Sequence, residues 1–250
     1  LIAYLYDVDI DASTLPGGLT LSGGGLSSVF QVESGVKATL RGVTIRDGGN
    51  GRDSRFSDTV VNRGTLELFN STLHDNRGGL RSFAGSVLLQ NCTVTKTGLN
   101  AVWNAAGSTM RLRHCTVAGN VMAGGSSAVV NLGTLTLENS IVANNQNAVG
   151  AADVAGAYAT VGSNLIGGDA RLAALARNGA RVETLELLPD SPAINAGLAS
   201  TVATDALGRP RPIGGAPDLG AVEAVVVAAV SSSNLDYFSL SGESLSWGAL

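Results

Sequence analysis

Three polar residues have the types and the spacing needed for acid–base chemistry. Asp47, Asp75 and Lys96 are each the second residue after a copy of a seven-residue motif. Carboxylates hold a divalent cation, and an amine with a lowered pKa can remove a proton that such a cation acidifies. If the copies stack in register, these three side chains lie within a few ångströms of one another. The same residue types also form ordinary solvated faces, so a plain surface is the alternative interpretation.

The histidines, the cysteines and the charge balance argue against several other kinds of site. The two histidines, His74 and His114, occupy different motif positions, so no Ser–His–Asp triad can be assembled. The two cysteines show no zinc-ligand spacing. The 16 basic and 20 acidic residues among 250 include no basic run, which argues against a nucleic-acid partner. The longest apolar run, residues 224–230, falls short of the roughly 18 residues that a membrane span needs.

The motif that precedes the three polar residues occurs five times. Its copies are 39–45 (TLRGVTI), 67–73 (ELFNSTL), 88–94 (LLQNCTV), 111–117 (RLRHCTV) and 136–142 (TLENSIV). Apolar and polar residues alternate within each copy, and the alternation shifts once, at the fourth residue. Such a shift predicts two short strands that meet at a bend.

A further strand is predicted before several of the motif copies. These segments are 59–64, 80–85, 101–107 and 128–133, each of which closes on Gly. About three short strands then fill each repeat, which leaves no room for a helix. Units of this size bury an apolar face only when they stack. The predicted fold class is therefore all-β, a parallel β-helix or solenoid.

Stacking would arrange equivalent motif residues in ladders along the axis. The fourth position, at the bend, holds Asn70, Asn91, His114 and Asn139, with Gly42 in the first copy. Asn tolerates the backbone of a bend and can exchange amide hydrogen bonds with its neighbours, so we interpret this ladder as structural. The fifth position forms an inward ladder of Val43, Ser71, Cys92, Cys115 and Ser140.

The two cysteines are neighbours in the inward ladder. Their Cα atoms would lie about 4.8 Å apart, the spacing of adjacent strands, which is within the range of a disulfide. Parallel side chains in register leave the Cβ atoms farther apart than a disulfide prefers. We therefore expect two buried free thiols, with a disulfide as the alternative.

Three segments are predicted: coils over 1–160, a C-terminal capping module over 161–223, and a β-prone tail over 224–250. Residues 170–181 have helical spacing of Ala and Leu and predict one surface helix in the module. Residues 205–223 are rich in Pro and Gly and are interpreted as a rigid cap over the last coil. The alternative makes Arg209 and Arg211 an anion site.

Longer stretches resemble known families. The repeats look like right-handed parallel β-helices of the pectate-lyase-like superfamily. The segments 10–25, 29–35 and 39–48 resemble those of secreted bacterial β-helix proteins, and 163–168, 187–197 and 205–223 are similar to the end module of choice-of-anchor Q domain surface proteins. This resemblance implies an extracellular or cell-surface location. In lyases of the superfamily, exterior acidic residues hold calcium and an Arg or Lys acts as the base, roles that would fall here to Asp47, Asp75 and Lys96.

Two functions from different classes follow from these observations. The favoured one is an extracellular structural protein that self-associates head-to-tail into a filament through its terminal strands. It needs no cofactor. The alternative is a calcium-dependent polysaccharide lyase or a carbohydrate-binding module on the exterior face. Aromatic residues make up only 4% of the chain, and Trp103 is expected within an apolar strand, which weakens the alternative.

Overall fold

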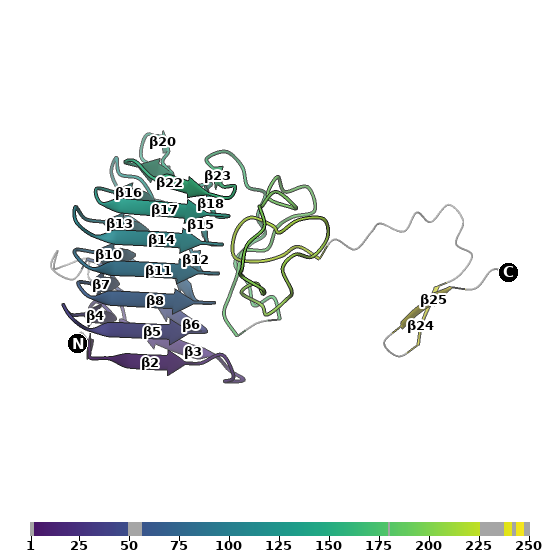
Figure 1. Cartoon of the computed structure of the whole chain (residues 1–250), viewed down its shortest axis with the longest axis horizontal. Helices are drawn as coiled ribbons and strands as arrows, with labels where there is room; N and C mark the ends of the chain where they lie inside the picture. Colours follow the sequence, from purple (N-terminus) through teal and green to yellow (C-terminus); the bar gives the residue numbers. More distant parts are fainter. Residues whose placement is uncertain (1–2, 50–56, 180, 226–237, 242–243, 248–250) are drawn as a thin grey trace.

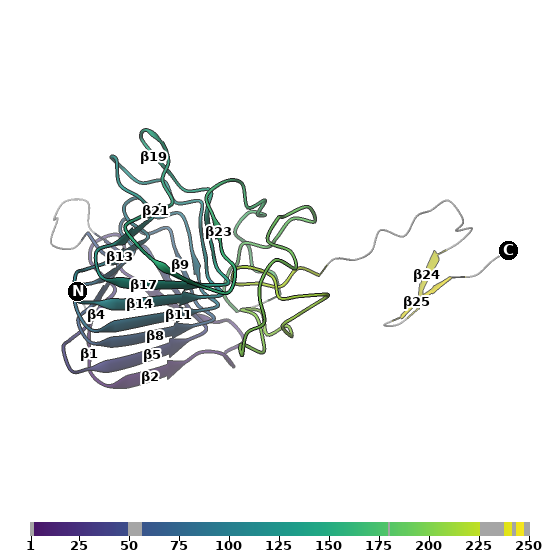
Figure 2. The same cartoon turned by 45° about the horizontal axis from the view of Figure 1, so that its top comes forward.

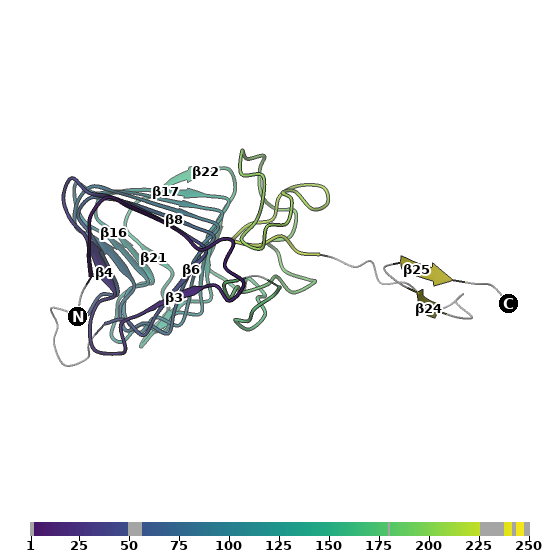
Figure 3. The same ribbon diagram turned by 90° about the horizontal axis from the view of Figure 1, so that it is seen from below.

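Three parallel sheets wind around one axis to form a β-helix. The computed structural model describes residues 3–49, 57–179, 181–225, 238–241 and 244–247. In these ranges the chain is all-β, without a helix, and the three sheets have seven strands each. The coils stack one above another (Figure 1), and seen along the axis they have a triangular outline (Figure 3). The predicted fold class is confirmed.

Each coil contributes one strand to each sheet. Sheet A contains β1 (Ala3–Leu5), β4 (Phe30–Val32), β7 (Val60–Asn62), β10 (Leu80–Ser82), β13 (Val102–Asn104), β16 (Val129–Asn131) and β21 (Val154–Ala155). Sheet B contains β2 (Val8–Asp11), β5 (Lys37–Arg41), β8 (Thr65–Phe69), β11 (Ser86–Gln90), β14 (Thr109–Arg113), β17 (Thr134–Glu138) and β22 (Ala159–Val161). Sheet C contains β3 (Leu19–Ser22), β6 (Val43–Arg46), β9 (Thr72–His74), β12 (Thr93–Val94), β15 (Thr116–Ala118), β18 (Ile141–Ala143) and β23 (Leu165–Ile166).

The apolar positions of the motif fill the interior of the coils. In sheet B the parallel register stacks five fully buried leucines: Leu40, Leu68, Leu89, Leu112 and Leu137. Alternate residues of a strand point to opposite faces, so the polar residues between them face outward. The alternation in the motif therefore sets both the strand register and the core.

The shift in the alternation of apolar and polar residues occurs where the chain makes a one-residue bend between sheets B and C. The residues at this bend have positive φ angles, from 45° to 66°: Gly42, Asn70, Asn91, His114 and Asn139. This left-handed conformation is strained for most side chains but is tolerated by Gly and Asn. The bend reverses which residues face inward, so both strands present apolar residues to the core.

The C-terminal module does not cover the last coil, contrary to the sequence-based expectation. Residues 167–225 lie along the outer face of sheet C and the adjoining bend (Figure 1, Figure 2). A second apolar core joins the two parts and includes Ile141, Ala143, Leu187 and Leu219. The module also reaches the first coil, where Arg181 Nε donates to the Leu15 carbonyl at 3.0 Å. The module therefore acts as a brace, because it packs along the side of the stacked coils and contacts several of them.

The predicted helix over 170–181 is wrong. The described residues of this segment are irregular and make two isolated antiparallel bridges, Leu172 with Leu187 and Ala176 with Thr184. Burial of Ala170 and Leu172 against sheet C outweighs the helix propensity of an Ala-rich sequence.

Two small antiparallel sheets complete the described strands. β19 (Gln146–Asn147) pairs with β20 (Gly150–Ala151), and β24 (Phe238–Ser241) pairs with β25 (Ser244–Trp247). The described tail strands thus pair with each other, whereas the sequence predicted pairing with coils of the same or another copy. Residues 226–237, 242–243 and 248–250 of the predicted tail lie outside the described residues. Where the chain is described, no helix is long and apolar enough to cross a membrane.

Candidate functional site

The structure places Asp47, Asp75 and Lys96 in one column. They follow β6, β9 and β12 and have φ angles of 53°, 51° and 51°. Main-chain hydrogen bonds run along the column, with Asp47 N donating to Asp75 O at 3.2 Å. In the next two coils Gly119 and Asn144 continue the column. These residues form the bend where the chain leaves sheet C, which is a structural reason for their regular spacing.

Both carboxylates in the column are already engaged. Asp47 accepts hydrogen bonds from Arg46 Nε at 2.8 Å and from Ser22 Oγ at 3.1 Å. The bond from Arg46 is the main reason that the pKa of Asp47 lies below its ordinary value. Asp75 lies 2.7 Å from Nδ1 of His74. Neither carboxylate is free to serve as an isolated cation ligand.

An open hollow of about 460 Å³ borders the two carboxylates. Asp47, Asp75 and Arg77 line it together with backbone of four glycines, and Lys96 is not among its lining residues. No three His, Cys, Asp or Glu side chains gather as a metal site in the part of the chain that is described. The hollow offers no lysine base and no free set of oxygen ligands, so these residues do not fit the calcium site that the family resemblance implies.

His74 connects the coils to the C-terminal module. Its side chain is only 3% exposed, and Nε2 lies 3.0 Å from Oε2 of Glu183 while Nδ1 faces Asp75. Thr72, two residues earlier, donates its hydroxyl proton to the main-chain carbonyl of Glu183. We call Thr72, His74, Asp75 and Glu183 together the His74 clasp. Sequence reasoning missed it because Glu183 is more than 100 residues away from β9 and belongs to no repeat.

The bend ladder also holds the module. Asn91 donates to Asn70 Oδ1 at 3.0 Å and to the carbonyl of Thr204 at 2.9 Å. Asn139 faces Nε2 of His114 at 3.4 Å and donates to the carbonyl of Leu198 at 2.8 Å. Within the ladder, an amide–amide hydrogen bond joins Asn70 and Asn91, and an amide–imidazole contact joins His114 and Asn139. Asn91 and Asn139 also bind the module.

His114 is fully buried beneath the module. Burial lowers its pKa to about 3, and the positive charges of Arg211 and Arg113 act in the same direction. A histidine that stays neutral over most of the pH range can replace Asn in the ladder. It is a poor candidate for proton transfer near neutral pH.

The inward ladder is buried and internally bonded. Val43 N donates to Ser71 Oγ at 3.2 Å, and Cys115 N donates to Ser140 Oγ at 3.0 Å. Cys92 and Cys115 are free thiols, and each sulfur contacts a carbonyl of the preceding coil. Burial raises the pKa of Cys92 well above its ordinary value, which makes it a poor nucleophile.

Two further polar ladders occupy the other corners of the triangle. At the end of sheet A they are Asn62, Ser82, Asn104 and Asn131, and after sheet C they are Asn76, Asn120 and Asn145. The recurring Asn before Gly in the segments 59–64 and 128–133 was a signal for the first ladder. Each corner of the coil therefore has hydrogen-bonded side chains in place of missing main-chain partners.

Arg209 and Arg211 do not form an exposed anion site. Arg211 is buried and pairs with Glu223, and it also donates to the carbonyls of Asp218 and Gly220. Burial raises the pKa of Asp218 and of Glu223, and it lowers the pKa of Arg211. Arg209 pairs with Glu186. These charges organise the irregular loops of the module.

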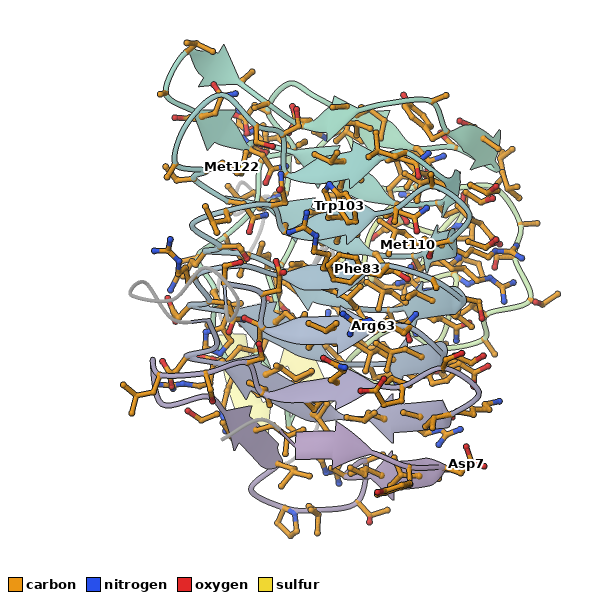
Figure 4. The ribbon with its side chains drawn as sticks, turned by 90° about the vertical axis from the view of Figure 1, so that its left-hand side faces the viewer. Asp7, Arg63, Phe83, Trp103, Met110 and Met122 are labelled. Carbon is orange, nitrogen blue, oxygen red and sulfur yellow. The ribbon has the colours of Figure 1, made fainter. Side chains whose placement is uncertain are left out.

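A cluster of side chains on the outer face of sheet A was not predicted from the sequence. Trp103 faces outward, not into an apolar interior, and lies beside Phe83 with 5.7 Å between ring centroids (Figure 4). The guanidinium of Arg81 lies 4.0 Å from the Trp103 ring centroid, and that of Arg63 lies 4.9 Å from the Phe83 centroid. We call Arg63, Arg81, Phe83 and Trp103 the Arg–aromatic stripe. The four residues come from three consecutive repeats, and the parallel register brings them together.

The comparisons with known proteins bear on the coils. The family described as right handed beta helix region matches residues 19–166, which is more than half of the chain. No curated protein and no solved structure matches the chain.

Proposed function

Because the chain belongs to the right-handed β-helix family, we propose that it is a structural protein of the cell exterior that forms a stiff rod. The similarity of its C-terminal module to choice-of-anchor Q surface proteins supports this location. The module braces the coils along their side, as would suit a protein exposed to mechanical and proteolytic stress. This function needs no cofactor and no bound cation.

One observation carries the proposal: the two histidines and the carboxylates of Asp47 and Asp75 are engaged in contacts within the coils or with the module. The clasp occupies His74 and Asp75, and the bend ladder occupies His114. Asp47 is paired with Arg46. A catalytic site keeps at least one reactive group free to meet substrate. The arrangement here therefore favours a structural role over the alternative of a lyase.

The ends of the β-helix support self-association. Among the described strands, β1, β2 and β3 at one end and β21, β22 and β23 at the other have a partner on one side only. At the first end, the inward residues Val8, Ile10, Leu19 and Leu21 are only partly buried. Unpaired edges and exposed apolar interior favour the addition of further strands. Head-to-tail contacts that do not close produce filaments.

Sedimentation velocity at increasing protein concentration tests this proposal. We expect species whose mass grows in whole multiples of the chain. A chain shortened to residues 1–225 keeps the module intact and should show the same circular dichroism spectrum with less assembly. Monomers at every concentration for the full chain would refute self-association.

The lyase alternative makes a different prediction. The hollow beside Asp47 and Asp75 is the feature that favours it. β-Elimination would produce unsaturated uronates that absorb in the ultraviolet, in a reaction that depends on calcium and is lost in Lys96→Ala. We expect no such absorbance with polygalacturonate and calcium, and its appearance would replace the structural proposal with the enzymatic one.

A further inference from the structure

The Arg–aromatic stripe is a partly exposed surface that combines two guanidinium groups with two aromatic rings. Phe83 is 40% exposed, and Leu132, which continues the same column two coils further on, is 61% exposed. Arg63 stacks over the Phe83 ring, and no carboxylate of a described residue pairs with it. Arg81 has one carboxylate nearby, Asp58 at 3.5 Å. Burial raises the pKa of Asp58, and the charge of Arg81 opposes this shift. The stripe therefore presents two cations beside apolar rings.

The Arg–aromatic stripe has the composition of a surface that binds protein. Trp and Arg dominate the energetically important positions of protein interfaces, and exposed aromatic clusters on a soluble surface mark interaction sites. The strands beneath it are paired on both sides, so their main-chain groups are already used. A partner can bind here only through side chains, which requires apolar residues and negative charge.

The C-terminal segment of the chain has this chemistry. Residues 226–250 include two acids, Asp236 and Glu243, and no Lys or Arg. In β24 and β25 four apolar residues alternate with serines, and the register places Phe238 opposite Trp247 and Leu240 opposite Leu245. A two-stranded hairpin on its own is marginally stable in water. This hairpin needs a partner surface.

We propose that the C-terminal hairpin of one copy binds the Arg–aromatic stripe of another copy. The acceptor belongs to a second copy because the module, which ends at Val225, lies on the side of the coils opposite sheet A (Figure 1, Figure 3). The inference rests on the proposed self-association and names its contact surface. Two negative charges in the segment match two cations in the stripe, and aromatic residues are present on both sides.

Charge reversal with rescue tests the proposal. One variant carries Arg63→Glu and Arg81→Glu, a second carries Asp236→Arg and Glu243→Arg, and a third carries all four changes. We expect each double variant to weaken self-association at least about tenfold, because like charges then face each other. The fourfold variant should regain most of the loss. Sedimentation equilibrium of the full chain gives the dissociation constants.

A matched control separates the contact from a general effect of charge. Lys96→Glu with Arg171→Glu changes the net charge equally at exposed positions away from sheet A, and should leave the dissociation constant within about twofold. Circular dichroism checks that every variant keeps its β structure.

Each other outcome overturns the proposal. If the double variants associate like the wild type, the hairpin does not bind the stripe, although end-on assembly of the coils stands. If the wild type does not associate at all, both proposals fail. If the stripe variant loses binding to polygalacturonate or dextran sulfate and keeps self-association, the stripe binds an anionic glycan instead.

Discussion

At the scale of single residues, the polar positions of the repeat serve the backbone. Asn70, Asn91 and Asn139 have a left-handed conformation that other side chains resist. Their amides also satisfy carbonyl groups that a bend leaves without partners. The types and spacing of these residues could be predicted from the sequence, because a turn selects Asn for both reasons. Their bonds to the module could not, since Thr204 and Leu198 belong to no repeat.

Asn139 should be the most sensitive residue of the bend ladder. Its side chain bonds to Leu198 N, Leu198 O and Ser163 N, and its φ angle is 45°. Asn139→Ala loses these bonds and adds backbone strain, so we expect a loss of about 3 kcal/mol in the free energy of unfolding. Asn139→Gly avoids the strain and should lose about 1 kcal/mol less. Urea unfolding measures both, and equal losses would exclude a contribution from strain.

His114 should make the protein less stable in acid. Its folded pKa is about 3, below the ordinary value of 6.5, so between these values the unfolded chain binds a proton that the folded chain does not. Stability from this residue is complete above pH 6.5 and falls as the pH drops, by about 1.4 kcal/mol per pH unit. His114→Asn removes this dependence and keeps a residue type that the ladder uses.

Urea unfolding of the wild type and of His114→Asn at pH 4, 5, 6 and 7 checks this prediction. The stability difference between the two proteins should shift steadily in favour of the variant as the pH falls. A difference that is constant over this range would show that His114 is not held neutral. Asp218 and Glu223, whose raised pKa values make them act in the opposite direction, are present in both proteins and cancel from the difference.

At the scale of elements, the repeated alternation predicted the strands correctly, whereas the helix propensity of a single segment predicted a helix that is not there. The two-residue alternation with one shift gives the strands of sheets B and C, because stacked coils repeat the same environment several times. Residues 170–181 have a helical pattern, yet the described ones are irregular because Ala170 and Leu172 pack against sheet C. The module has no repeat, so no pattern could locate it along the side of the coils.

The His74 clasp should stabilise residues 182–187 of the module against local unfolding. Glu183→Ala removes the carboxylate that faces His74 Nε2, so we expect faster amide hydrogen exchange in residues 182–187 and unchanged exchange in the coils. Glu186→Ala removes an ion pair within the module, that with Arg209, and serves as the control. Equal protection of residues 182–187 in Glu183→Ala and the wild type would contradict a fastening role for the clasp.

At the scale of the whole molecule, the structure is a braced rod with open strand edges. Three ladders of side chains hold the corners of the coils, one apolar core fills them, and a second core attaches the module. The structural contacts of the described histidines and the unpaired strands at both ends agree with the proposed assembly. The sequence predicted the stacked coils, but only the structure shows that the module lies along sheet C and leaves the end coils and sheet A uncovered by it.

Electron microscopy of the purified full chain tests the structural proposal most directly. The account predicts filaments one β-helix wide that lengthen with protein concentration and are shortened or lost in the chain ending at residue 225. Isolated particles at every concentration would contradict assembly, and filaments unchanged by removal of residues 226–250 would contradict a contribution of the C-terminal segment to it.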